Sequence, residues 1–405
     1  MASSVDIAEK TIDGYRDELI DLFSEMLAIR SIAPESGGEG ESKRADFLEI
    51  TLKSWGFPVK RYEYIDGRSV QRSNLISVFG ECPRTLWLIA HIDTVSEGEI
   101  SLWKTDPFKP VLNGDRIYAR GANDNGHGIM ASIYAIKTLK ESGIKMKYNL
   151  GIALVADEEV GSKYGIQRLL SEGIFGTEDM FIVPDSGTND GSEIEIAEKG
   201  ILWVKVTAIG KQAHASMPDT GRNAYRDLIQ FLNETDTFLH TKFNKKDQLF
   251  NPSSSTFEMT KHEKNVDSIN IIPGIEVSYM DFRILPEYSI DEILDDMNDI
   301  ADKYRSERSE IKIEVFNRQN AATQTERDSE VVQILWDAVT KSRKINPKIV
   351  GIGGGTCAVF FRDKGMPTVV WSTQDPAIDH QPNEWASITN ILKDAKTFVR
   401  LVCED

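Results

Sequence analysis

The chain has 405 residues, which is long for one hydrophobic core and indicates two domains. Its apolar content of 40% and charged content of 27% are typical of a soluble globular protein. A net charge of −17 disfavours binding to nucleic acid or to an anionic membrane surface. The three scattered cysteines show no paired spacing, and the first residues have no apolar signal segment. We therefore expect free thiols and a cytoplasmic protein.

The first half of the chain alternates helical periodicity with strand-like apolar runs, which indicates a largely parallel or mixed sheet covered on both faces. The predicted helices are 7–29, 43–55, 127–140 and 164–170, and the predicted strands are 59–64, 74–79, 85–90, 111–118, 149–156 and 180–183.

The pattern changes near Gly200. From there to about Asn317 we predict strand 201–209, helix 223–239, strands 254–261 and 274–284, helix 290–304 and strand 311–316. This βαββαβ order is the split βαβ, ferredoxin-like arrangement, which is complete without strands from elsewhere. Helices 329–342, 358–364 and 383–401 with strands 348–351 and 367–371 then restore the first pattern. The sequence predicts a discontinuous main domain, 1–199 and 318–405, interrupted by an inserted domain, 200–317.

A Gly-rich turn, Tyr118–Gly126, follows a predicted strand and contains Asp124. Such a turn places its carboxylate at the edge of a sheet where α/β proteins bind ligands. Four other polar pieces also follow strand-like runs: His91-Ile-Asp93, Asp157-Glu158-Glu159, Pro184-Asp185 and His380. We interpret Asp124 as a carboxylate that bridges two divalent metal ions.

Each motif also has an ordinary structural interpretation. In His91-Ile-Asp93 the two polar side chains share one face of a strand end, so the carboxylate could orient a metal-bound imidazole, although most His-x-Asp pairs are structural. The triplet ending at Glu159 could be a solvated turn. Cations would relieve its repulsion, and one glutamate could bind metal while Glu158 acts as a base.

Three further features are ambiguous from spacing alone. His214 is a surface residue or a donor to a developing oxyanion. The run Gly353-Gly354-Gly355-Thr356 precedes a helix and could hold an anion or carbonyl oxygen, without the lysine of a phosphate-binding loop. Arg283 could bind a substrate carboxylate or pair with Asp281. His127, three residues after Asp124, could support the ligands.

Taken together and in this order, these motifs resemble the family-20 metallopeptidases over nearly the whole chain, from His91 to the motif His380-Gln-Pro-Asn-Glu384. The family includes aminoacylases, acetylornithine deacetylase, succinyl-diaminopimelate desuccinylase, carboxypeptidase G and carnosinase-type dipeptidases. The resemblance implies a zinc-exopeptidase-like three-layer αβα catalytic domain. It also implies an inserted ferredoxin-like lid that usually forms a homodimer.

The resemblance also implies roles. Two divalent ions, most often zinc with cobalt or manganese as alternatives, would be held by His91, Asp124, Glu159, Asp185 and His380, with Asp124 bridging. Asp93 would orient His91, Glu158 would be the general base, and His214 would reach an active site in its own or the partner subunit. The substrate contacts would be Asn270, Arg283, Gly354, Gly355 and Thr356.

The chain departs from the family pattern in three places. Gly126 stands where a lysine is frequent, Cys357 where an aspartate is frequent, and Asp185 where deacylases usually have glutamate. The aspartate at position 185 slightly favours a peptide as the expected substrate. We expect a hydrolase that cleaves the amide C–N bond of a small peptide or N-acyl amino acid. The alternative is a catalytically silent amino-acid-binding or regulatory relative.

Overall fold

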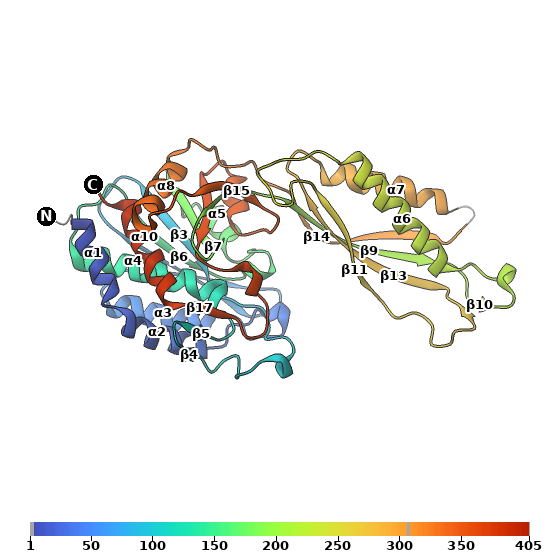
Figure 1. The fold of residues 1–405 in the computed structure, drawn as a ribbon. Helices are drawn as coiled ribbons and strands as arrows, with labels where there is room; N and C mark the ends of the chain where they lie inside the picture. Colours follow the sequence, from blue (N-terminus) through green and yellow to red (C-terminus); the bar gives the residue numbers. More distant parts are fainter. Residues whose placement is uncertain (1–3, 306–307, 405) are drawn as a thin grey trace. The chain divides into compact units, whose positions relative to one another are not determined.

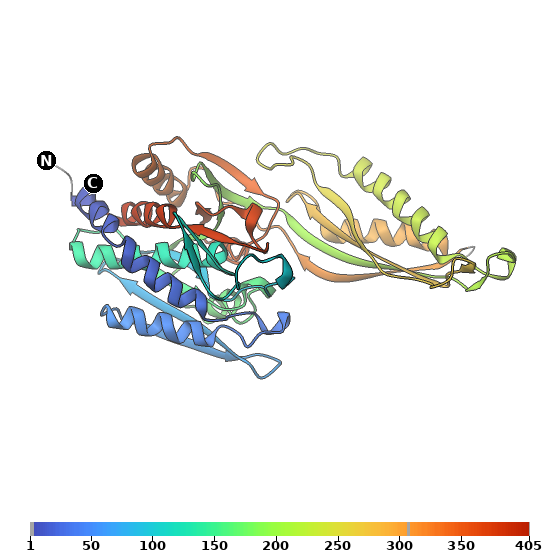
Figure 2. The same ribbon diagram turned by 60° about the horizontal axis from the view of Figure 1, so that its bottom comes forward.

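The computed structural model describes residues 4–305 and 308–404, which form two compact units (Figures 1 and 2). Unit 1 comprises Met1–Ile196, Gln324–Val350 and Thr356–Asp405. Unit 2 comprises Ala197–Thr323 and the short segment Gly351–Gly355. Among the described helices, none has the length and apolar character needed to cross a bilayer.

Unit 1 is built on an eight-stranded mixed sheet with the order β1-β2-β6-β3-β7-β16-β8-β15 (Figure 1). Strands β6, β3, β7 and β16 are parallel, whereas β2 and β8 are antiparallel to their neighbours β6 and β16. The strands are β1 (Lys60–Ile65), β2 (Gln71–Phe79), β3 (Thr85–His91), β6 (Asn149–Val155), β7 (Met180–Gly187), β8 (Glu193–Glu198), β15 (Lys348–Ile352) and β16 (Thr368–Ser372). The predicted mixed α/β class is confirmed, and β8 is an additional strand.

Helices cover both faces of this sheet. On one face, α5 (Ile166–Ser171) and α9 (Ala358–Arg362) pack against an apolar cluster that includes Trp87 and Ile89 of β3. Side chains alternate along a strand, so Leu88 points to the opposite face, where α4 (Gly128–Ser142) contacts β3 and β6. The remaining helices are α1 (Ser4–Asp13), α2 (Arg16–Ala28), α3 (Ser42–Ser54), α8 (Glu330–Arg343) and α10 (Ile388–Val402), of which α1, α2 and α8 contact α10.

Two predicted elements near the termini are wrong in detail. The helix predicted over 7–29 is two helices, α1 and α2, separated at Gly14-Tyr15, since glycine disfavours a helix interior. The last helix starts at Ile388 rather than Asn383, because Ser387 accepts the N–H of Asn390 at 3.1 Å as an N-cap.

The strand predicted over 111–118 is a hairpin. Gly114 adopts φ 62° in the turn between β4 (Val111–Asn113) and β5 (Arg116–Tyr118). A third strand, β17 (Trp385–Ser387), pairs antiparallel with β5. The turn that carries Asp124 therefore follows a small three-stranded sheet rather than a strand of the main sheet.

Unit 2 has the element order β9, α6, β11, β13, α7, β14 and the antiparallel sheet order β11-β13-β9-β14. This is the predicted split βαβ arrangement, with both helices on one face of the sheet (Figure 1). Its core joins Val204, Phe231, Phe282 and Met297. The elements are β9 (Gly200–Ile209), α6 (Ala224–Lys242), β11 (Thr256–His262), β13 (Ile275–Ile284), α7 (Ile290–Tyr304) and β14 (Glu310–Gln319), with a two-stranded arm of β10 (Ala213–His214) and β12 (Ile271–Ile272).

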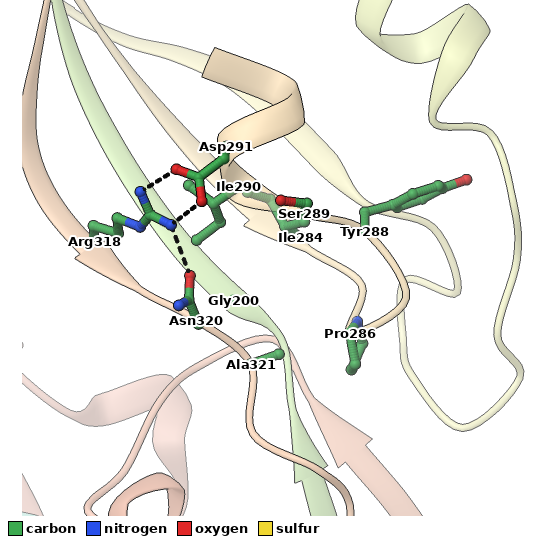
Figure 3. A pocket seen from close by; sticks show the side chains of 10 residues that line it. All are labelled: Gly200, Ile284, Pro286, Tyr288, Ser289, Ile290, Asp291, Arg318, Asn320 and Ala321. Carbon is green, nitrogen blue, oxygen red and sulfur yellow. Dashed lines mark hydrogen bonds and ion pairs between the residues drawn. The ribbon is translucent and has the colours of Figure 1, made fainter. Parts of the chain in front are cut away.

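A hollow of about 130 Å³ lies in unit 2 beside the start of α7 (Figure 3). Arg318 on its wall is already paired with Asp291, at 2.5 and 2.9 Å, and contacts Asn320 at 3.5 Å. None of the predicted site residues lines this hollow, so we assign no ligand to it.

Candidate metal centre

The first candidate ligand, His91, is the last residue of β3 and is 2% exposed. Its Nδ1 lies 3.0 Å from the backbone oxygen of Asp93 and 3.5 Å from the Asp93 carboxylate. That carboxylate instead accepts the backbone N–H groups of Glu158 at 3.1 Å and Glu159 at 3.3 Å. Asp93 therefore connects the end of β3 to the turn after β6, and its backbone oxygen makes the closer contact with His91.

Asp124 lies between two histidines. Its Oδ1 is 2.8 Å from Nε2 of His91, and its Oδ2 is 3.0 Å from Nε2 of His380. The carboxylate thus presents one oxygen to each imidazole, which is the arrangement expected of a group that bridges two cations.

Glu159 and Asp185 complete the set, one beside each histidine. Glu159 Oε2 is 3.1 Å from Nε2 of His380, and its other oxygen accepts the N–H of Val95 at 3.1 Å. Asp185 Oδ1 is 3.4 Å from Nε2 of His91. All five predicted metal ligands therefore lie in one cluster.

Potential ligand atoms form two groups that share His91. One contains Asp124 and Glu159, and the other contains Glu158 and Asp185, with all atoms of a group within 4.8 Å of one another. The backbone of Asp157 is left-handed, with φ 50°, where the chain turns from β6 towards the two glutamates. This turn brings both glutamates to the cluster, so Glu158 lies beside the ligands.

The electrostatics of the cluster are those of crowded, buried acids. Burial, followed by repulsion from Asp185, raises the pKa of Glu158 well above its usual value. Burial and repulsion from Asp124 raise the pKa of Glu159 to about 7. Hydrogen bonds to Asp124 and Glu159 raise the pKa of His380 to about 11. For His91, burial favours the neutral ring, but the charges of Asp185 and Asp124 outweigh it and raise the pKa.

The donor set fits divalent cations. Imidazole nitrogens and carboxylate oxygens bind zinc, cobalt and manganese, and none of the described cysteines is among the potential ligand groups. Divalent cations among these four acids would relieve the repulsion that contributes to the raised pKa of Glu158 and Glu159.

Comparison with known proteins gives the same assignment. The model of peptidase family M20/M25/M40 matches residues 87–404, and these residues include all the clustered side chains. An uncharacterized metallohydrolase of Methanocaldococcus jannaschii is 37% identical over 95% of this chain and 99% of its own length. This chain belongs to peptidase family M20/M25/M40.

Other relatives of this M20 chain include hydrolases of different substrates. A succinyl-diaminopimelate desuccinylase of Pelagibacter ubique is 26% identical, covering 95% of this chain and 97% of the relative. A tripeptidase structure from Staphylococcus aureus superposes with a TM-score of 0.77 at 19% identity, covering 96% of this chain and 97% of the other, and shows the same fold. The M20 chain is therefore a member of a metal-dependent hydrolase family that acts on amide bonds.

Two residues of the centre were missed by sequence reasoning. Asn125 is 1% exposed and donates a hydrogen bond to Asp185, at 2.5 Å, and to the backbone oxygen of Pro184. Glu384 is 1% exposed and accepts backbone N–H groups of the turn that carries Asp124. The only available signal was their position, since each lies within four residues of a predicted ligand.

Position 126 of this chain has no room for a side chain. A Cβ there would lie 2.4 Å from the backbone oxygen of Gly121 and 2.8 Å from the ring of Phe23. The turn therefore has no room for the lysine that is frequent in the family. His127 does not replace it, because its Nε2 bonds Asp394 of α10 at 2.7 Å and so joins α4 to α10.

Two candidate residues lie together on the arm of unit 2. His214 is exposed, and its Nδ1 lies 2.8 Å from the hydroxyl of Ser216. Asn270 is also exposed, and its backbone oxygen accepts the N–H of Ala215 at 2.9 Å. The two residues are close in the arm because His214 of β10 pairs with Ile271 of β12, which directly follows Asn270.

The remaining candidates divide between the units. Arg283 in β13 forms a bidentate pair with Asp281, at 2.6 and 3.0 Å, and also donates to the backbone oxygen of Gly353 at 3.1 Å. Gly354 and Gly355 are exposed in unit 2. Thr356 belongs to unit 1, where its hydroxyl accepts the N–H of Ala358. The next residue, Cys357, is buried in the apolar cluster under α9, which explains why a carboxylate is unfavourable there.

Proposed function

We propose that this protein hydrolyses the amide C–N bond of a small peptide or N-acyl amino acid at a centre of two divalent cations, with zinc as the first candidate and cobalt or manganese as the alternatives. The observation that carries the proposal is the single carboxylate of Asp124 between His91 and His380, at 2.8 and 3.0 Å. One ion would be held by His91 and Asp185 and the other by His380 and Glu159, with Asp124 shared.

Bound cations polarise the scissile carbonyl and lower the pKa of a nearby water. Glu158 accepts the proton of the attacking water and delivers it to the departing amine. Burial and the neighbouring acids raise the pKa of Glu158 in the metal-free protein, and bound cations would lower it towards the range in which the group can both take and return a proton. Asp93 holds Glu158 in place, because its carboxylate accepts the Glu158 backbone N–H.

His214 would supply a hydrogen bond to the developing oxyanion, in its own or a partner subunit, and Asn270 would accompany it. Arg283 and the exposed Gly354-Gly355 backbone would contact a substrate carboxylate. In support, Arg283 has a nitrogen next to that loop, 3.1 Å from the oxygen of Gly353. We further propose a cytoplasmic homodimer formed through unit 2, which would act as the lid.

Metal analysis and a substrate panel test this function. The purified protein should contain about two divalent ions per chain, and the reconstituted protein should hydrolyse at least one member of a panel of dipeptides, tripeptides, N-acetyl and N-succinyl amino acids. Asp185 favours the peptide members of the panel. Two bound ions with no turnover on any member would support the catalytically silent relative instead, and fewer than two ions would contradict the dinuclear centre.

A further inference from the structure

Glu384 has a buried carboxylate that accepts hydrogen bonds from the turn carrying Asp124. Its Oε1 accepts the backbone N–H groups of Asn123 at 2.8 Å and Asp124 at 3.0 Å. Its Oε2 accepts the N–H of Gly121 at 3.0 Å and a guanidinium hydrogen of Arg120 at 2.6 Å. Four donors thus meet one carboxylate that is 1% exposed, and both of its oxygens are used.

The backbone around Glu384 is fixed to the strand that precedes this turn. The Ala119 N–H donates to the backbone oxygen of Glu384 at 3.1 Å, and the next residue, Trp385, pairs with Tyr118 of β5. His380 lies four residues before Glu384 in the same connection. One short segment therefore supplies both a predicted ligand and the acceptor that holds the predicted bridging residue.

The four contacts use both oxygens of the Glu384 carboxyl group. A carboxylate accepts through both oxygens, whereas an amide has only one accepting atom and a protonated acid has reduced capacity. Arg120, itself 1% exposed, supplies the compensating charge. Hydrogen bonds to a charged group are shorter and stronger than those between neutral groups, so this arrangement fixes the turn more firmly than solvent-exposed contacts would.

We propose that Glu384 is a positioning residue for the cation pair: it holds the backbone of residues 121–124 so that the Asp124 carboxylate faces His91 and His380. This inference rests on the proposed function, in which Asp124 is the shared ligand. Glu384 itself is no ligand, because its oxygens are occupied by backbone and guanidinium donors.

Glu384→Gln tests the proposal with almost no change in side-chain volume, because the new amide group would face N–H donors. We expect the affinity of the metal-free protein for zinc, measured by calorimetric titration, to fall about 10–100-fold, as for other groups that orient metal ligands. The visible absorption of the cobalt(II)-loaded variant should also shift, since the ligand geometry changes. A role confined to folding would lower the melting temperature and leave affinity and spectrum unchanged.

Glu195→Gln is the matched control. Glu195 is a buried carboxylate of unit 1 that accepts from the buried Arg362 at 3.0 Å and lies on β8, a strand that carries none of the predicted ligands. We expect it to lower the melting temperature while preserving zinc affinity and the cobalt spectrum. If Glu384→Gln does not fold, Arg120→Lys is used in its place. We expect this variant to show a smaller loss of zinc affinity and an altered cobalt spectrum.

The outcomes separate this inference from the proposed function. Wild-type affinity and spectrum in Glu384→Gln, or in Arg120→Lys where that variant carries the test, would overturn the positioning role. A wild-type protein that binds no cation pair would instead refute the dinuclear centre.

Discussion

His91 and His380 contact opposite oxygens of one carboxylate, that of Asp124, although they lie far apart in the sequence and all of residues 197–323 of unit 2 come between them. His91 ends a strand of the central sheet, whereas His380 follows β16 in a connection with left-handed backbone, φ 60°. In the proposed two-cation centre, this carboxylate would be the shared ligand.

Glu158→Ala and the more conservative Glu158→Gln should separate metal binding from proton transfer. We expect metal content near that of the wild type and a fall in kcat of about 10²–10⁴-fold, which is the usual contribution of a general acid–base group. Elemental analysis and steady-state kinetics on the best panel substrate provide the measurement. Retained turnover in both variants would remove Glu158 from this role.

Gly126→Ala should destabilise the protein, because the new methyl group would lie 2.4 Å from a backbone oxygen. We expect a loss of about 1–3 kcal/mol in the free energy of unfolding, as for other overpacked sites, together with weaker metal binding. Gly67→Ala is the control, since a Cβ there meets nothing within 4 Å, and it should change stability by less than about 0.5 kcal/mol. Equal stability of the two variants in urea unfolding would contradict the packing argument.

The metal-free protein should lose stability as pH rises above about 5. Burial raises the pKa of Glu41 and of Asp157 to about 7, so the folded state keeps protons that the unfolded state has released. The stability that these two groups contribute is fully present below their unfolded pKa values of 4.5 and 3.8 and is lost as pH rises through 7. Each such group contributes a slope of at most about 1.4 kcal/mol per pH unit. His380, with its pKa raised to about 11, acts in the same direction above pH 6.5.

Denaturant unfolding of chelator-treated protein at several pH values between 5 and 8 measures this effect. Asp157→Asn should show a shallower slope than the wild type, because one of the titrating groups is gone. A free energy of unfolding that rises over this range would show that other groups dominate.

Arg283→Lys should raise KM for a substrate with a free carboxylate by about tenfold or more, with little change in kcat. Lysine keeps the charge but loses the bidentate geometry that arginine offers a carboxylate. Arg318→Lys is a control in the same unit, because Arg318 forms a similar bidentate pair with Asp291 at the hollow to which we assign no ligand. Equal KM values in the two variants would exclude Arg283 from substrate binding.

The local sequence was enough to predict most of the secondary structure and the order of elements in both units. Periodicity and turn residues predicted most elements of the central sheet and the βαββαβ order of unit 2, because these patterns reflect which face of each segment is buried. The hairpin of β4 and β5 was missed, since Asn113-Gly114-Asp115 interrupts a run that otherwise has the pattern of one strand. The ordered motifs resembled the family, and that resemblance implied the candidate ligands. His91, Glu159 and Asp185 meet because strands β3, β6 and β7 are parallel neighbours that end at one edge of the main sheet.

Only the tertiary structure decided how those residues meet. The carboxylate of Asp93 accepts backbone N–H groups of the glutamate turn more closely than it contacts His91, and this depends on β3 lying beside β6. Asn125 reaches Asp185, and Glu384 receives four donors, through contacts between segments distant in sequence. Hydrogen-bond partners over such separations are set by the path of the whole chain, which no local pattern of residue types encodes.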